Sequence, residues 1–314
     1  MTIRALLLVV AALVAAPAAL ADGGPMYSLQ GGAGIAAPNG SRFIPISTNS
    51  GNTMLLVLKH GTVWSWQSIV GAYGIPITTY RDTGGLSRDG KLLYLQSSAY
   101  PATPSATTTK FLVLNTRTLR TENGFFLKGT FAFDALSPNG KRLYLTQHID
   151  ANNISRYVVR AYDLTRDRLL PGRIADRTQK SWVMQGNALT RTTSPGGRWV
   201  YTLYDNYGGY PFIHALDTVR GAAHCIGLPW KSTTNQNALT NVRLTLHGSR
   251  LAVHWQSGRP WLNVDTRTWR VTPAAGARFP WLWLGIGLGG AAALLLLVLR
   301  RPGLAKGTLS ARPA

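Results

Sequence analysis

The chain of 314 residues is poor in the residues that cross-link or catalyse. Cys225 is its one cysteine, so no disulfide forms within the chain and the fold has to be held by its core. Glu122 is its one glutamate and lies in the turn-like sequence RTENG, so a two-carboxylate glycosidase would have to use aspartates, most of which lie in predicted turns. The six histidines fall in five segments, and His224 adjoins Cys225, which places the two on opposite faces of a strand. No catalytic residue, metal site or cofactor is therefore predicted.

Long uncharged apolar runs occur at the two ends. Residues 5–14 follow Arg4 and precede Pro17 and a small-x-small triplet at 19–21, which predicts a signal peptide, residues 1–21, cleaved before Asp22. A retained N-terminal anchor is the alternative, but the run is short for a span of roughly 20 residues.

Near the other end, residues 281–299 carry no charge over 19 positions, roughly 28 Å of helix at about 1.5 Å per residue. Trp281 and Trp283 stand where an aromatic belt would lie, and the tail after Leu299 has basic residues and no carboxylate. These features predict a transmembrane helix at 279–299 and a basic cytoplasmic tail at 300–314. A buried core helix is the alternative, although such a helix rarely lacks polar residues all round.

Acidic residues are few. The chain has 33 lysines and arginines against 12 acids, a formal charge of +21. Residues 22–278, which we expect outside the membrane, hold 28 of these cations and all 12 acids, a charge of +16. Such a surface attracts anionic envelope polymers or lipid headgroups, although scattered arginines without a basic run also suit a plain arginine-rich composition. Export excludes intracellular nucleic acid as a partner.

A short phrase recurs along this exported part. It joins Ser or Thr, a turn pair and Gly to an alternating apolar strand, as in LSRDGKLLYL, LSPNGKRLYL, TSPGGRWVYT and LTLHGSRLAV. Their glycines, Gly90, Gly140, Gly197 and Gly248, are 50, 57 and 51 residues apart, and a weaker copy surrounds Gly51. A glycine of positive φ followed by alternating residues is typical of a hairpin turn leading into a half-buried strand.

A second phrase follows in each unit, with Asn or Asp and a Thr directly after it or one residue later: FLVLNTRTLR, VRAYDLTRDRL, FIHALDTVRG and WLNVDTRTWR. The Asn or Asp side chain is expected to bond its own backbone and close a second hairpin. Each unit then contains four antiparallel strands in about 40 to 57 residues, the pattern of a propeller blade.

Over residues 43–272 the chain resembles the exported WD-like and YVTN-type β-propellers, whose blades carry a Ser-Pro-Asp-Gly-Lys-x-Leu-Tyr-Val phrase. Residues 136–145 match best, with Asn139 in place of Asp. The resemblance implies an all-β propeller of about five four-stranded blades at residues 43–275, after a lead-in or ring-closing segment at 22–42. Five units are fewer than the six to eight blades usual in the family. An open or two-part sandwich-like stack is the alternative fold.

Candidate binding residues follow from this fold, because the first strand of each blade lines the channel. Alignment on the turn glycine places Asp134 and Arg191 at one level and Arg243 at the next, with Arg81 and Asp82 slightly earlier in the strand of their blade. These residues form a mixed-charge channel mouth that is expected to hold an anion through Arg81, Arg191 and Arg243. The alternative is that Asp134 and Arg191 only neutralise each other, since buried charges are usually paired.

Two further surfaces are candidates for partners. An aromatic recognition loop is expected at Tyr204, Tyr207, Tyr210 and Phe212, unless these rings pack between blades. Gly285, Gly289 and Ala293 share one face of the predicted membrane helix and form a candidate surface for a weak homodimer, although small residues are common in such helices.

These features predict a single-pass cell-membrane protein with its propeller outside, acting as a non-catalytic binding or scaffold module for a protein partner or an anionic envelope polymer. The alternative is a hydrolase or lactonase with a channel-mouth site, which rests on fold analogy alone. A third interpretation is a ligand sensor working with a partner protein, because the tail is too short for an output domain.

Overall fold

The computed structural model describes residues 28–79, 82–97, 108–150, 153, 155–178, 183–206, 209–229 and 236–275. These residues form five antiparallel sheets, here called sheets I to V, and one 3₁₀ helix, η1 (Gln236–Asn241). Each sheet contains four strands in chain order. Sheet II gains β1 and sheet III gains β14.

Sheet I contains β2 (Ile35–Ala36), β3 (Ser41–Ser47), β4 (Thr53–Lys59) and β5 (Thr62–Ile69). Sheet II contains β1 (Ser28–Leu29), β6 (Tyr73–Pro76), β7 (Leu92–Ser97), β8 (Thr108–Asn115) and β9 (Thr121–Lys128). Sheet III contains β10 (Phe131–Leu136), β11 (Arg142–His148), β12 (Arg156–Asp163), β13 (Arg168–Leu169) and β14 (Met184–Gln185). Sheet IV contains β15 (Ala188–Thr193), β16 (Trp199–Tyr204), β17 (Phe212–Asp217) and β18 (Ala222–Gly227). Sheet V contains β19 (Val242–His247), β20 (Arg250–Trp255), β21 (Pro260–Asp265) and β22 (Val271–Pro273).

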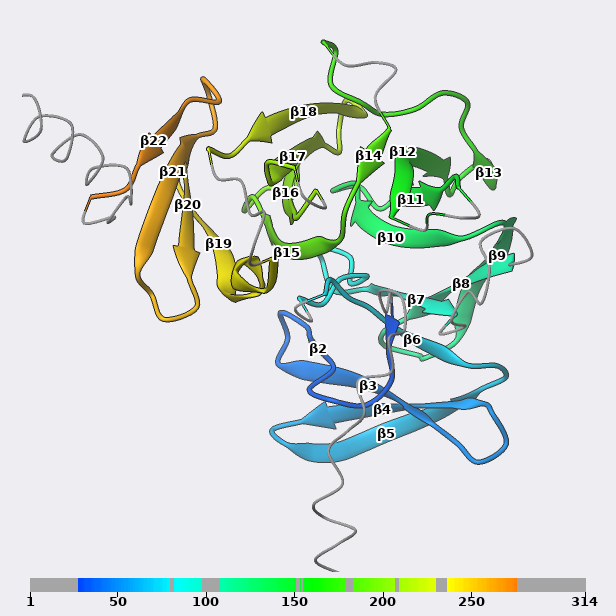
Figure 1. Ribbon diagram of the computed structural model, residues 1–314. Coiled ribbons are helices and arrows are strands. Elements are labelled where there is room, and N and C mark those ends of the chain that lie inside the picture. Colours follow the sequence, from blue (N-terminus) through cyan, green and yellow to red (C-terminus); the bar gives the residue numbers. More distant parts are fainter. Residues whose placement is uncertain are drawn as a thin grey trace, which may run out of the picture.

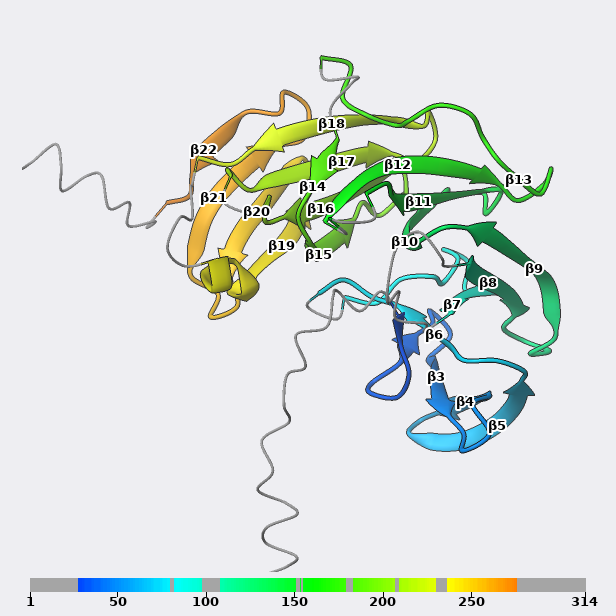
Figure 2. The same cartoon turned by 45° about the vertical axis from the view of Figure 1, so that its right-hand side comes forward.

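The sheets stand side by side around a common centre. Figures 1 and 2 show an arc from sheet I (blue) to sheet V (orange), with β10, β15 and β19 toward the centre and β9, β18 and β22 on the rim. This is the arrangement of a β-propeller and not of two stacked layers. The prediction of an all-β fold made of four-stranded antiparallel sheets is confirmed.

The first repeated phrase closes the turn between the two inner strands of sheets II, III and IV. In sheet III, the Gly140 amide donates to the Ser137 carbonyl (2.9 Å), and the Ser137 hydroxyl accepts from the Arg142 amide (2.9 Å). Gly140 has φ +68°, a conformation that glycine adopts without a steric cost. The serine thus joins the turn to the strand that follows.

The second repeated phrase closes the outer hairpin as expected. One side-chain oxygen of Asn115, Asp163, Asp217 or Asp265 accepts hydrogen bonds from the amides two and three residues further on. In sheets II, IV and V a threonine follows directly and links the two turns of the sheet, since its hydroxyl donates to a carbonyl of the first turn. These bonds join Thr116 to Gly90 (2.6 Å), Thr218 to Gly197 (2.9 Å) and Thr266 to Ser249 (3.0 Å).

The hydrophobic core is divided among the spaces between successive sheets. Phe43, Leu55 and Val57 of sheet I pack against Leu93 and Leu95 of sheet II. Similar clusters fill the spaces between sheets II and III, III and IV, and IV and V. Within the described ranges, no such cluster joins sheet V to sheet I. Each inner sheet is therefore stabilised by a neighbour on both faces, and sheets I and V by one neighbour each.

The predicted signal peptide, membrane helix and cytoplasmic tail, at 1–21, 279–299 and 300–314, lie outside the described residues. Among the residues that are described, no helix has the length and apolar character needed to cross a membrane.

Candidate binding site at the centre of the sheets

The segment between β6 and β7 crosses the centre of the molecule from sheet II to sheet IV. The Thr79 amide donates to the Ala188 carbonyl on β15 (2.8 Å). One Asp82 oxygen accepts hydrogen bonds from the Thr190 hydroxyl (2.6 Å) and the Arg191 amide (2.8 Å). Asp82 therefore attaches this crossing segment to β15, 108 residues further along the chain.

A buried ion pair lies beside this crossing. Arg191 Nη2 is 3.3 Å from Asp134 Oδ1, and the two side chains are 9% and 1% exposed. Asp134 is the extra residue of a β-bulge in β10, where Phe133 pairs with Leu145 and Ala135 pairs with Tyr144. Bulges redirect a side chain in this way and are common beside binding sites.

The ion pair leaves two buried polar atoms unpaired. Arg191 Nε donates to the Thr202 hydroxyl (3.2 Å), and the guanidinium lies 5.8 Å from the centre of the Phe133 ring. Arg191 Nη1 and Asp134 Oδ2 have no hydrogen-bond partner among the described residues. A buried polar atom without a partner costs about 1–3 kcal/mol, so a group that supplied one donor and one acceptor here would recover part of that energy.

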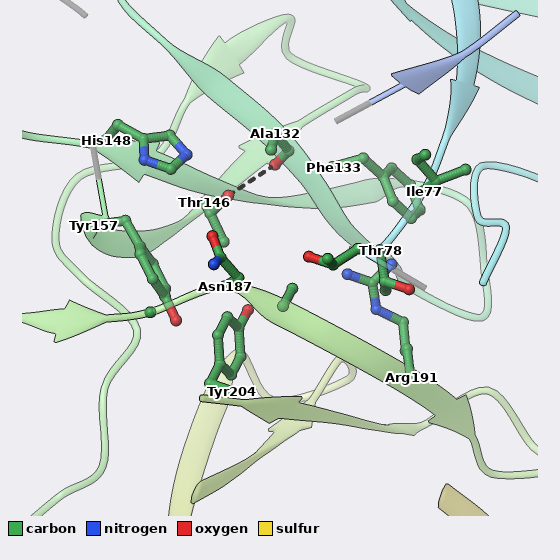
Figure 3. Close-up of a pocket in the computed structure, with 13 residues that line it drawn as sticks. Ile77, Thr78, Ala132, Phe133, Thr146, His148, Tyr157, Asn187, Arg191 and Tyr204 are labelled. Carbon is green, nitrogen blue, oxygen red and sulfur yellow. Dashed lines mark hydrogen bonds between the residues drawn. The ribbon is translucent and has the colours of Figure 1, made fainter. Parts of the chain in front are cut away.

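A small cavity of about 30 Å³ lies on one side of Arg191, enough for about two water molecules. Figure 3 shows the side chains of Tyr157, Tyr204 and Asn187 pointing toward one another across it. The two tyrosine hydroxyls interact with each other and form no hydrogen bond to any other described residue. Burial raises the pKa of both phenols well above the ordinary value, so both stay neutral hydrogen-bonding groups.

A larger hollow of about 260 Å³ lies on the other side, at the end of the molecule where the repeated turns meet. Its wall comes mainly from sheets II, III and IV and includes Arg191 and Asp134. It also includes residues of the repeated turns, Arg88, Pro138 and Gly197. Two neighbouring hollows, of about 410 and 440 Å³, also have Pro138 in their walls. The turn of sheet III thus stands between three adjoining hollows.

The structure brings together three of the five predicted channel-mouth residues, namely Asp82, Asp134 and Arg191. Arg243 instead donates to the carbonyls of Thr240 and Val242, next to its own strand. Arg81 lies outside the described residues. The anion-binding role predicted for this group remains a prediction, and its ion pair matches the alternative in which Asp134 and Arg191 neutralise each other.

Two of the four residues predicted to form an exposed aromatic loop are buried instead. Tyr204 and Phe212 are 1% and 3% exposed, and their rings stack at 5.2 Å because the two residues pair across β16 and β17. They belong to the core and not to an exposed recognition surface. Tyr210 is 56% exposed. Tyr207, like Gly285, Gly289 and Ala293, lies outside the described residues.

The sequence analysis missed the polar lining of the small cavity. Tyr157 follows no repeated turn, and Asn187 and Thr78 lie in connections without a shared pattern. No three His, Cys, Asp or Glu side chains within the described ranges lie close enough to hold a metal ion. The described residues of the site supply hydrogen-bond donors and acceptors and one ion pair.

Comparison with known proteins gives no family. No family model matches the chain, and no curated protein matches its sequence.

Among solved structures, the hydrazine synthase of Kuenenia stuttgartiensis is similar at a TM-score of 0.46 and 15% identity, over 74% of this chain and 63% of that one. TolB of Acinetobacter baumannii is similar at 0.42 and 16%, over 74% and 53%. Sqt1 of Saccharomyces cerevisiae is similar at 0.44 and 13%, over 73% and 59%. This chain thus spans less than two thirds of each of the three. Similarity at this level does not bear on activity, and the fold assignment rests on the sheets themselves.

Proposed function

We propose that this chain is a non-catalytic binding module that works outside a membrane. In this proposal, residues 1–21 are removed as a signal peptide, sheets I to V act as five blades of an exported propeller, residues 279–299 anchor it, and residues 300–314 are cytoplasmic. The uncharged run at 281–299 with its basic tail supports the anchor.

The ligand is an anionic chain bound across the end of the molecule that carries the repeated turns. The observation that carries this proposal is the set of three hollows around Pro138, of about 260, 410 and 440 Å³. Adjoining hollows of this size suit an extended ligand better than a single small molecule held in one closed pocket.

The charges around these hollows favour an anion. Asp89, Asp134 and Asp163, the acidic residues in their walls, already pair with Lys91, Arg191 and Arg166.

Arg88 and Lys141 are exposed in the same walls and form no ion pair within the described part of the chain. Elsewhere the carboxylates of Asp217 and Asp265 close turns. The acids are thus occupied inside the fold, and the cations at the hollows remain available to a partner.

Binding of fluorescent poly-L-glutamate to the full-length chain in detergent tests the proposal. Arg142, which is half-buried, also lies in the wall of one hollow. The triple variant R88Q/K141Q/R142Q is expected to weaken binding roughly tenfold, from about 0.5 kcal/mol per charge. The control variant K110Q/K128Q/R259Q removes the same charge from other strands and loops, and it should bind like the parent.

Equal weakening by the two variants, or no binding by the parent, would refute a ligand site at the turns. Competition separates the two sources of anion. Displacement of the probe by a teichoic-acid-type polyphosphate indicates an envelope polymer, and displacement by an acidic peptide alone indicates a protein partner.

A further inference from the structure

The two end sheets of the arc differ in their free faces. In sheet I, the side chains facing sheet II are Phe43, Leu55 and Val57, which are 1%, 0% and 4% exposed. The alternate residues point the other way, because successive side chains of a strand lie on opposite faces. These residues are also apolar, and they are Ile44, Ile46, Met54, Leu56 and Leu58.

Sheet V ends the arc with a polar face. Its inward residues include Val242, Leu251 and Val253, which pack against sheet IV. The alternate residues are Arg243, Thr245, Ala252, His254, Asn263 and Thr272. The Thr245 hydroxyl is 2.8 Å from His254 Nε2. Sheet V is therefore a cap suited to water, whereas the free face of sheet I is made of half-buried apolar side chains, like a face inside the molecule.

The outer strand of sheet I extends this apolar face to the rim. Trp66 pairs with Leu56, and Trp64 and Trp66 are 68% and 60% exposed. The ammonium group of Lys59 lies 4.4 Å from the centre of the Trp64 ring. Exposed tryptophans beside a basic side chain are typical of surfaces that enter a lipid headgroup layer.

The charge of sheet I favours an anionic lipid surface over a second copy of this chain as the partner of this face. Residues 28–79 contain no Asp or Glu, while Arg42 and Lys59 are exposed at one end of the face. A second copy of sheet I would supply only further cations, and sheet V would supply the polar face that carries Arg243. Anionic phospholipid headgroups complement both the cations and the aromatic edge.

The proposed anchor follows β22 of sheet V and would tether the whole arc of sheets to a membrane. Three residues, 276–278, separate Ala275, the last described residue, from the expected anchor at 279–299, so roughly 15 Å of extended chain would join sheet V to the membrane. We infer that the free face of sheet I and the Trp64–Trp66 edge rest on the anionic phospholipid surface of the membrane that anchors the chain. This inference rests on the proposed anchoring.

The test uses tryptophan emission of the full-length chain in nanodiscs of phosphatidylcholine with phosphatidylglycerol, prepared with and without brominated acyl chains. Bromine quenches a tryptophan only when the two come into contact. Emission from the pair at the sheet edge is the difference between the parent and the W64F/W66F variant, and that difference should be mostly lost in brominated discs. It should recover at high salt or in discs of phosphatidylcholine alone, because salt screens the headgroup attraction.

Two further variants complete the design. W269F is the matched control, since Trp269 packs on His224 and Trp199 within the fold and its emission should not be quenched. W281F/W283F reports on the anchor in the same way. Quenching of Trp281 and Trp283 without quenching of Trp64 and Trp66 overturns the lipid contact and leaves the anchor standing. If neither pair is quenched, both proposals fail. A blue-shifted but unquenched Trp64–Trp66 signal overturns the lipid contact in favour of a protein on this face.

Discussion

Removing the charge of Asp134 tests whether the centre of the molecule depends on its ion pair. Asp134→Asn keeps the size of the side chain and one acceptor for Arg191 Nη2, so the change isolates the charge. The guanidinium then remains 9% exposed without a counter-ion, with the Thr202 hydroxyl and the Phe133 ring beside it. Breaking one side of a buried pair costs about 3–5 kcal/mol, and the retained acceptor places this variant near 3 kcal/mol.

Urea unfolding followed by tryptophan emission measures this loss, with the slope against urea checked for a change in the unfolding reaction. The double variant D134N/R191Q removes both charges and should cost about 2 kcal/mol less than the two single changes together. Asp163→Asn is the matched control. Its partner Arg166 is 68% exposed at 3.7 Å, and asparagine closes the same kind of turn at position 115, so this variant should cost much less than Asp134→Asn.

Two results would refute this reasoning. One is a cost for Asp134→Asn no larger than that of Asp163→Asn. The other is a double variant whose cost equals the sum of the single changes, since independent sites are additive and a coupled pair is not.

Three further predictions concern turns, the thiol and acid. Gly85 has φ +92°, and an added Cβ would lie 2.5 Å from the Tyr94 carbonyl oxygen, whereas a Cβ added at Gly140 would have no atom within 4 Å. Gly85→Ala should therefore lower the free energy of unfolding in urea by more than Gly140→Ala does. Equal losses of stability would contradict this prediction. Burial raises the pKa of the Cys225 thiol to about 12, so a maleimide should label it at pH 8 only after unfolding, and rapid labelling of the native chain would disprove its shielding. Burial acts to raise the pKa of Asp217, but hydrogen bonds from Arg198 and two backbone amides hold it below the ordinary value. Its contribution to the free energy of unfolding is therefore present above about pH 4 and lost as the pH falls further, and Asp217→Asn should flatten that acid slope; an unchanged slope would exclude it.

The turns were predictable from the sequence because they are local. The Ser137 and Asp217 side chains bond atoms within five residues, so the short phrase already contains both donor and acceptor. The same holds for the all-β fold, because an alternating strand after each turn needs a partner on either side.

The centre was only partly predictable. Alignment on the turn glycine placed Asp134 and Arg191 at one level, and they pair in the structure. The attachment of Asp82 to β15 has no local signal, because its bonds join Asp82 to a strand more than a hundred residues away. The predicted aromatic loop included two residues too many, because Tyr204 ends β16 and Phe212 begins β17. The two rings therefore meet in the sheet, and only the residues between them form the connection.

The threonine bonds that join the two turns of a sheet divide the molecule into a fixed end and an adjustable end. At the turn end of sheets II, IV and V, a threonine hydroxyl holds the second turn to a carbonyl of the first, at Gly90, Gly197 and Ser249. The distance from the turn glycine to the later Asn or Asp nevertheless falls from 25 residues in sheet II to 17 in sheet V, so the variation lies at the opposite end. That opposite end is where inserted epitopes, labels or extra residues should be tolerated, and where the chain has room to diversify while the turn end keeps its shape.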